Sequence, residues 1–392
     1  MHDSIFWVFS ISVSIVLYTY VGYGIIIYIL AKVFPYQKRS LVVPSNSFEP
    51  LVTLIIAAYN EEGCIDQKIR NTLSLLYPPE KLKIWLVTDG STDKTPEKVK
   101  KFETVKLFHQ PERRGKIHAI NRIMKFVETP FVIFCDANTD LNPDAVQKIV
   151  RHYRDDKIGG VAGEKRIFTN LEENAPGAGE GIYWKYESFL KKQDAKVYSV
   201  VGAAGELFSI RTTLYEEPEE NMILEDFYIS LRIVSKGFRF LYEKEAFAIE
   251  KASSSIAEEW KRKVRISAGA FQAMIKLQYL LNPFRFGIVS FQYISHRVLR
   301  WTLAPLSLPI ILLSNILLVF YAQSFYILIL AGQVFFYSLA YLGYKNQNTK
   351  ILIKGFFAPY YFVMMNLAVY AGFFRFLRRK QSVVWDKSKR AE

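Results

Sequence analysis

Four apolar runs in the first 150 residues each lead into a short polar cluster, and this alternation constrains the fold more than any other feature. The clusters occupy residues 59–61, 89–91, 113–116 and 136–138, and a helical pattern follows each of them. Repeated units of strand, polar loop and helix predict an α/β domain with a mainly parallel central sheet. The carboxyl ends of parallel strands meet in one crevice, where such folds bind ligands.

Long apolar segments flank this α/β region on both sides. Residues 5–28 are almost uninterruptedly apolar and contain no Lys or Arg, so we expect an N-terminal membrane anchor rather than a cleaved signal. Residues 303–342 are roughly twice the ~20 residues that one crossing requires, with a plausible turn at 321–324. Residues 356–374 could form a further span. The sequence therefore predicts a multi-pass protein of the cell membrane.

The distribution of basic residues predicts the side of the membrane on which the α/β domain lies. The net charge is +14, and much of it flanks the apolar segments, including Lys32, Arg297, Arg300 and the residues from 375 onward. This distribution is typical of a cytoplasmic membrane surface with anionic lipid, not of a nucleic-acid site. Four complete crossings would place the basic tail outside, so the number of C-terminal crossings stays open.

Five regions follow from these patterns. We expect an anchor and linker over residues 1–43, a cytoplasmic domain over 44–283 and an amphipathic interfacial helix over 284–302. A C-terminal transmembrane region then covers 303–376, and a basic tail covers 377–392.

Two of the polar clusters have alternative interpretations when each is considered alone. Asp89 could bind a nucleobase or ribose, or it could belong to an ordinary Asp-Gly turn. The basic cluster ending at Lys116 could neutralise a diphosphate at a helix start, or it could be a solvated loop. No Gly-x-x-x-x-Gly-Lys-Ser/Thr sequence is present, which disfavours a P-loop.

Carboxylates complete the set of candidate functional groups. Asp136 and Asn138 stand one residue apart at a strand end, where both could bind a divalent cation, or they could form a turn that caps a helix. Glu225 and Asp226 interrupt an apolar helix, which favours a general base in a cleft because an unpaired buried charge is costly. The alternatives are a solvated helix face or a salt bridge to Arg232.

The order and spacing of these motifs resemble a known family. Residues 50–62, 87–95, 113–121, 134–145, 202–211 and 224–237 are similar to the membrane-embedded inverting glycosyltransferases of family 2. That family includes cellulose, hyaluronan and poly-N-acetylglucosamine synthases. The resemblance implies a GT-A type nucleotide-diphospho-sugar transferase domain, a UDP-sugar donor, a glycan or lipid-linked acceptor, and Mg²⁺ or Mn²⁺.

The resemblance also implies roles for individual residues. Asp226 would be the catalytic base, and Asp136 and Asn138 would bind the metal, with Asn138 standing where the family's Asp-x-Asp motif has its second aspartate. The remaining roles fall into two groups. The nucleotide-sugar would contact Tyr59, Glu61, Asp89, Lys116 and Asp136. The acceptor would contact Gly202, Gly205, Glu225 and Arg265.

One motif departs from the processive members of the family. Where they carry Gln-x-x-Arg-Trp, this chain has Arg262, Arg265 and Ile266 at the three defined positions. We expect transfer of a hexose or N-acetylhexosamine from a UDP-sugar to a growing polysaccharide. Two alternatives remain, namely non-processive transfer to a polyprenyl-phosphate or glycolipid, and an inactive membrane protein that binds a nucleotide or glycan.

Overall fold

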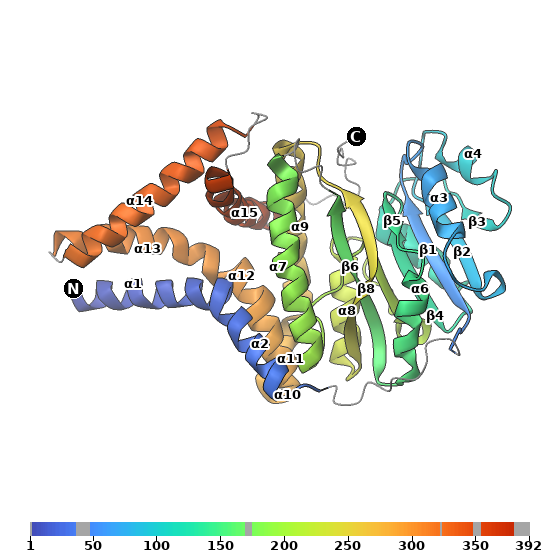
Figure 1. Cartoon of the computed structure of the whole chain (residues 1–392), viewed down its shortest axis with the longest axis horizontal. Coiled ribbons are helices and arrows are strands. Elements are labelled where there is room, and N and C mark those ends of the chain that lie inside the picture. Colours follow the sequence, from blue (N-terminus) through green and yellow to red (C-terminus); the bar gives the residue numbers. More distant parts are fainter. Residues whose placement is uncertain (1, 37–47, 169–174, 322–323, 348–353, 380–392) are drawn as a thin grey trace.

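An eight-stranded mixed sheet forms the framework of one end of the molecule (Figure 1). The computed structural model describes residues 2–36, 48–168, 175–321, 324–347 and 354–379. The predicted linker at 37–43 and most of the predicted basic tail, residues 380–392, lie outside these ranges. The strands in sheet order are β3 (Val105–Phe108), β2 (Leu82–Thr88), β1 (Val52–Ala58), β4 (Phe131–Asp136), β7 (Leu207–Arg211), β6 (Ile158–Phe168), β8 (Arg239–Lys251) and β5 (Thr139–Leu141).

The half of the sheet around β1 is parallel, as predicted. Strand β1 lies between β2 and β4, with Leu54 opposite both Ile84 and Ile133. Its residues are buried almost without interruption, as expected for a parallel strand covered on both faces. Leu54 packs in one apolar cluster with α3 (Ile65–Leu73) and α6 (Ala145–Val150). Ile55 packs in another with α5 (Lys116–Met124) and α8 (Glu225–Ser235).

The direction of strand order reverses between β1 and β4. The chain passes from β1 outward to β2 and β3, then returns to place β4 on the other side of β1. This arrangement makes a topological switch point, and loops at the carboxyl ends of the two strands diverge to leave a crevice. The polar clusters that follow β1 and β4 therefore lie at the crevice.

The other half of the sheet differs from the sequence-based expectation. Strand β7 is antiparallel to β4 and β6, whereas β6 and β8 pair in parallel. No strand was predicted at residues 158–168, which form β6. Glycines stand there in place of the larger apolar residues that would indicate a strand, because β6 packs closely against its neighbours. A Cβ atom at Gly160 would lie only 2.1 Å from the ring of Phe240 on β8.

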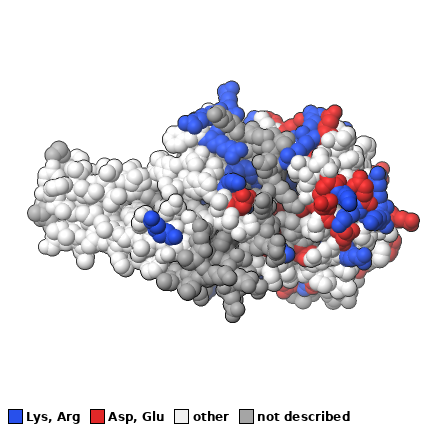
Figure 2. Space-filling view, turned by 90° about the horizontal axis from the view of Figure 1, so that it is seen from above, with Lys and Arg blue, Asp and Glu red and all other residues white. Residues whose placement is uncertain are grey.

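Within the described residues, four helical segments are long and apolar enough to cross a membrane, namely Asp3–Val33, Leu303–Phe320, Ser324–Lys345 and Gly355–Leu377. The first combines α1 (His2–Leu17), a π turn (Tyr18–Gly22) and α2 (Tyr23–Val33). The others contain α13 (Leu303–Phe320), α14 (Ser324–Lys345) and α15 (Lys354–Leu377). In Figure 2, few charged side chains are visible where the apolar helices project from the molecule. Charged side chains gather instead over the sheet domain.

Two long helices stand between the sheet and the apolar helices (Figure 1). They are α7 (Ala175–Val197), which contacts α2 and β6, and α9 (Ile256–Lys276), which packs along α15. The π turn leaves the Tyr20 carbonyl outside the regular helical pattern, and the Tyr186 hydroxyl on α7 donates to it at 2.8 Å. The first apolar segment is thus fastened to the domain by a specific hydrogen bond.

Residues 284–302 do not form one continuous amphipathic helix. They belong to α10 (Pro283–Phe286), α11 (Ile288–Tyr293), a π turn (Ile294–Val298) and α12 (Leu299–Trp301). Gly287, with φ of 50°, separates α10 from α11. Arg285 is exposed, but Arg297 and Arg300 are buried. Location at the membrane interface remains a prediction for this segment.

A buried ionic cluster explains why these two arginines turn inward. Glu187 on α7, only 1% exposed, accepts hydrogen bonds from Arg297 and from Arg300, the latter at 3.2 Å. His296 lies between Glu187 and Asp194, with its Nδ1 2.6 Å from an Asp194 carboxylate oxygen. The cluster joins α7 to the segment that leads into α13.

Glu187→Gln should lower the free energy of unfolding by about 3–5 kcal/mol, because it leaves buried guanidinium groups without their counter-charge. The matched control is Glu216→Gln, which removes a half-exposed partner of Arg232 and Lys236 and should cost about 0–1 kcal/mol. Denaturant unfolding of the full chain in detergent measures both. Equal losses would show that the cluster does not hold the two regions together.

Candidate active site

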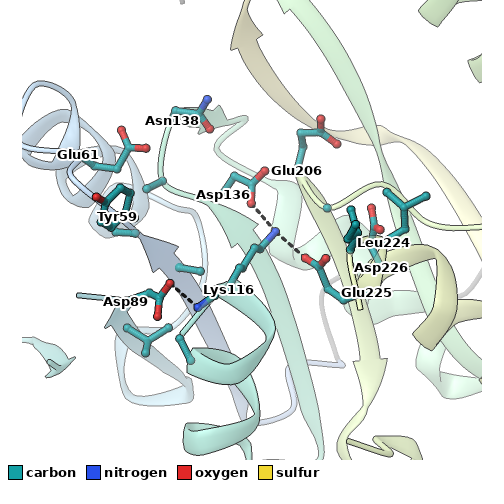
Figure 3. A pocket seen from close by; sticks show the side chains of 18 of the residues that line it. Tyr59, Glu61, Asp89, Lys116, Asp136, Asn138, Glu206, Leu224, Glu225 and Asp226 are labelled. Atoms are coloured by element: carbon teal, nitrogen blue, oxygen red, sulfur yellow. Dashed lines mark hydrogen bonds and ion pairs between the residues drawn. The ribbon is translucent and has the colours of Figure 1, made fainter. Parts of the chain in front are cut away.

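A cavity of about 240 Å³ opens at the carboxyl ends of β1 and β4 (Figure 3). It contains almost every side chain that the sequence analysis singled out. Those lining it are Tyr59, Glu61, Asp89, Lys116, Asp136, Asn138, Gly205, Glu225, Asp226 and Arg265. Gly202 is the exception, because it is buried under the ring of Phe227 and does not line the cavity.

Tyr59 and Arg113 form a flat surface on the β1 side of the cavity. The Arg113 guanidinium carbon lies 3.6 Å from the centre of the Tyr59 ring, so the two planes are in contact. The loop after β1 is held by the next loop, because the Glu61 amide donates to the Thr95 hydroxyl at 2.8 Å. The pair presents a planar group of the kind on which a nucleobase can stack.

The Asp89 carboxylate accepts hydrogen bonds from the backbone of the basic loop at residues 113–116. One of its carboxylate oxygens accepts from the Arg114 amide and the other from the Gly115 amide, each at 2.8 Å. Gly115 has φ of 103°, a conformation that favours glycine, and α5 begins at the next residue. Asp89 therefore lines the cavity and also fixes the turn that presents Lys116.

Lys116 joins carboxylates from two distant parts of the chain. Its Nζ lies 2.8 Å from Asp136 at the end of β4 and 2.9 Å from Glu225 at the start of α8 (Figure 3). Burial opposes the charge, but the two carboxylates raise the pKa of Lys116 well above its usual value. Burial also raises the pKa of Asp136, and Lys116 counteracts that effect. Arg232 pairs with Glu216, so the alternative salt bridge to Glu225 is not formed.

Asp226 lies beside this ion-pair group. A Cβ atom at Gly205 would be 3.2 Å from Lys116 Nζ and 3.3 Å from Asp226 Oδ2, so the missing side chain leaves room for both charged groups at this point. Burial and the adjacent Glu225 carboxylate raise the pKa of Asp226 to about 7, despite the opposing effect of Lys116. A carboxylate with this pKa is well suited to accept a proton near neutral pH.

A second group of charges, not predicted from the sequence, adjoins the cavity, and two of its members, Glu206 and Glu250, line it. Lys165 on β6 is buried and pairs with Glu206 and with Glu250, which is 2.5 Å away. Burial opposes ionisation of Glu206, but Lys165 lowers its pKa to about 2. Lys165 was not predicted because strand β6 was not predicted. It stands between Glu164 and Arg166 in the sequence, so no pattern there marks it as a buried residue.

The residues at the end of β4 fit a hard divalent cation. Asp136 supplies a carboxylate, and Asn138 donates its amide nitrogen to Glu250 at 3.0 Å, which leaves its oxygen as the available ligand atom. Within the described ranges, no group of three or more His, Cys, Asp or Glu side chains could hold a metal ion by itself. A cation here would take further ligands from phosphate oxygens and water, as Mg²⁺ commonly does.

Fold and site together define the class of protein, a GT-A type nucleotide-sugar transferase fold with apolar helices. The structure is similar to that of a mannosyltransferase from Pyrobaculum calidifontis, solved in complex with GDP-Man and Mn²⁺. The TM-score is 0.73 over 95% of this chain and 99% of that one, at 20% sequence identity, so the likeness concerns the fold. The predicted fold class is confirmed.

A sequence match covers part of the sheet domain. Residues 53–217 match the model of glycosyl transferase family 2, and the chain carries a domain of that family. It is 27% identical over 237 residues to a poly-beta-1,6-N-acetyl-D-glucosamine synthase from Staphylococcus aureus, covering 57% of this chain and 56% of that one. Identity to the Staphylococcus epidermidis enzyme of the same name is 24% over 261 residues, covering 64% and 62%. The chain therefore matches little more than half the length of these curated relatives.

Asp89→Ala should loosen the turn at residues 113–116, because two backbone amides lose their acceptor. Each such hydrogen bond contributes about 0.5–1.5 kcal/mol, so amide exchange at Arg114 and Gly115 should accelerate roughly fivefold to a hundredfold. Hydrogen exchange with mass spectrometry measures this effect. Asp66→Ala, which removes only a partly exposed partner of Lys98, is the control. Unchanged exchange in the Asp89 variant would contradict the capping role.

Proposed function

We propose that this protein transfers a sugar, with inversion, from a nucleotide-diphosphate sugar to a hydroxyl group of a growing polysaccharide. The donor is a UDP-hexose or UDP-N-acetylhexosamine, and transfer takes place on the cytoplasmic side of the membrane. One observation carries the proposal: Asp226, Lys116 and Asp136 line the same cavity, although they lie far apart in sequence. A proton acceptor thus stands next to the groups that would stabilise a leaving diphosphate.

The donor would lie across the switch point of the sheet. The Tyr59–Arg113 surface supports the nucleobase, with Glu61 and Asp89 nearby for the nucleoside. Lys116 meets the diphosphate, which competes with Asp136 and Glu225 for its ammonium group. Asp136 and Asn138 would hold Mg²⁺ or Mn²⁺, which when bound neutralises charge on the phosphates.

Transfer requires one proton acceptor and no covalent intermediate. Asp226 takes the proton of the acceptor hydroxyl, and the oxygen attacks the anomeric carbon on the face opposite the leaving group. A new glycosidic bond forms as the bond to the phosphate oxygen breaks, and the electron pair leaves with the diphosphate. Lys116 stabilises the negative charge that develops there. Configuration at the anomeric carbon is inverted because displacement occurs once.

The decisive experiment uses the purified full chain in lipid nanodiscs. A panel of UDP-sugars with Mn²⁺ and oligosaccharide acceptors is assayed for UDP release and product mass. A lengthened oligosaccharide supports the proposal. Binding of UDP without turnover of any donor would instead favour a protein that only binds nucleotides.

Asp226→Asn should reduce transfer about 10²–10⁴-fold while UDP affinity stays unchanged, because the variant retains shape but cannot accept the proton. Wild-type activity should rise with pH through about 7, since the carboxylate must be deprotonated to act. Asp156→Asn, at a fully exposed side chain, is the matched control. Initial rates and calorimetric titration with UDP provide the two readouts. Retention of near-normal transfer would exclude Asp226 as the base.

Lys116→Met should weaken UDP binding roughly tenfold to a hundredfold, because a charge-assisted interaction contributes about 1.5–3 kcal/mol. Titration with UDP in the presence of Mn²⁺ measures the change. Lys125→Met, at an exposed position just beyond the same helix, tests for a general effect of lost charge. If both variants bind UDP equally well, Lys116 does not contact the diphosphate.

A further inference from the structure

A second, larger cavity of about 560 Å³ lies between the sheet domain and the apolar helices. Its walls come from α7, α9, α12 and α15, with Tyr20 of the first π turn at one side. These elements meet at the junction of the two regions (Figure 1). Asp226 and Leu224 line this cavity as well as the first one. The proposed base is therefore accessible from both.

One wall of the second cavity is apolar and comes from a candidate membrane span. Phe357, Phe362, Met365 and Val369 line it, and all four lie on α15. The segment Gly355–Leu377 is long and apolar enough to cross a bilayer. A hydrocarbon chain on this wall would pass from the membrane region toward the sheet domain.

Five basic residues also line the cavity together with three carboxylates, and several of the basic and indole donors have no acceptor. Among the described residues, no acceptor contacts Arg300 Nε, Arg300 Nη2 or the buried indole nitrogen of Trp184. Glu187 engages only one nitrogen of Arg300. Lys191, 3% exposed, donates no hydrogen bond to any described residue, and its Nζ lies 5.6 Å from the centre of the Trp184 ring.

These unpaired donors need an anion with several acceptor oxygens. A buried cation without a partner is costly, and burial lowers the pKa of Lys191. The other three basic residues that line the cavity already have ion-pair partners, because Arg262 and Lys263 pair with Glu259 and Arg297 pairs with Glu187. A phosphate group supplies oxygens for a guanidinium and an ammonium at once. A neutral glycan would leave the Lys191 ammonium without an ion-pair partner.

We propose that the second cavity binds a lipid-linked acceptor, with its phosphate held by Arg300 and Lys191 and its hydrocarbon chain along α15. The saccharide that it carries presents a hydroxyl to Asp226. This inference rests on the proposed glycosyl transfer and specifies its acceptor class. It also gives Lys191 a function, since that side chain has no ion-pair partner in the described structure.

Binding can be tested on the purified full chain in phosphatidylcholine nanodiscs. The probes are a polyprenyl phosphate, the polyprenol of equal length, inorganic phosphate and a neutral oligosaccharide, and tryptophan fluorescence reports binding because Trp184 and Trp301 line the cavity. We expect the polyprenyl phosphate to bind at least tenfold more tightly than the polyprenol. Neither inorganic phosphate nor the oligosaccharide at equal concentration should displace it.

Two pairs of variants locate the phosphate. Lys191→Met and Arg300→Met should each reduce the preference for the phosphate over the alcohol at least fivefold. Lys192→Met, at the exposed neighbour on α7, and Arg285→Met, at the exposed arginine on α10, should leave it unchanged. UDP affinity reports folding in all four. If Arg300→Met is unstable, Lys191→Met alone is sufficient to test the inference, because Lys191 has no ion pair to lose.

Several outcomes would overturn the inference. They are equal affinity for polyprenyl phosphate and polyprenol, displacement by inorganic phosphate or by the oligosaccharide, or an unchanged preference in Lys191→Met. If the chain then still transfers sugar to a soluble oligosaccharide, the lipid acceptor is wrong and the glycosyltransferase stands. Lipid phosphate binding without turnover of any donor sugar, on lipid or oligosaccharide, would contradict the proposed function and leave the phosphate site intact.

Discussion

The ion-pair group centred on Lys116 is the interaction on which the candidate site depends. Its amine contacts Asp136 at the end of β4 and Glu225 at the start of α8, and so links the parallel half of the sheet to the helix that carries Asp226. Asp89 orients the lysine through the two amides that precede it. Because the three side chains are largely shielded from solvent, their charges interact more strongly than they would in water. The cavity therefore has a defined shape before any ligand arrives.

A second set of buried charges links the sheet domain to the apolar helices. Glu187 and Asp194 on α7 hold His296 and two arginines from the segment before α13. The cost of desolvating these groups is offset only while all partners are present. The position of the sheet domain relative to the apolar helices is thus specified by geometry as well as by apolar contact. That positioning brings the second cavity up to Asp226.

Sequence patterns predicted the parallel half of the fold and most of the candidate site, for a physical reason. Residues that follow β1, β2 and β4 are local in sequence to their strands, and parallel strands bring their carboxyl ends together. Non-local partners were not predictable in this way. Lys165 was missed because its strand is rich in glycine, and its pairing with Glu206 and Glu250 arises only in the folded sheet. Arg297 and Arg300 looked interfacial because the partner that draws them inward lies more than 100 residues earlier.

The position of Asp226 at the boundary of both cavities has a kinetic consequence. Asp226 lines both cavities, so under the proposed function the donor and the acceptor could occupy them at the same time. Such an arrangement supports a ternary complex and sequential kinetics rather than a substituted-enzyme cycle. Under the same proposal, an occupied second cavity would keep water away from the anomeric carbon, which would limit wasteful hydrolysis of the donor.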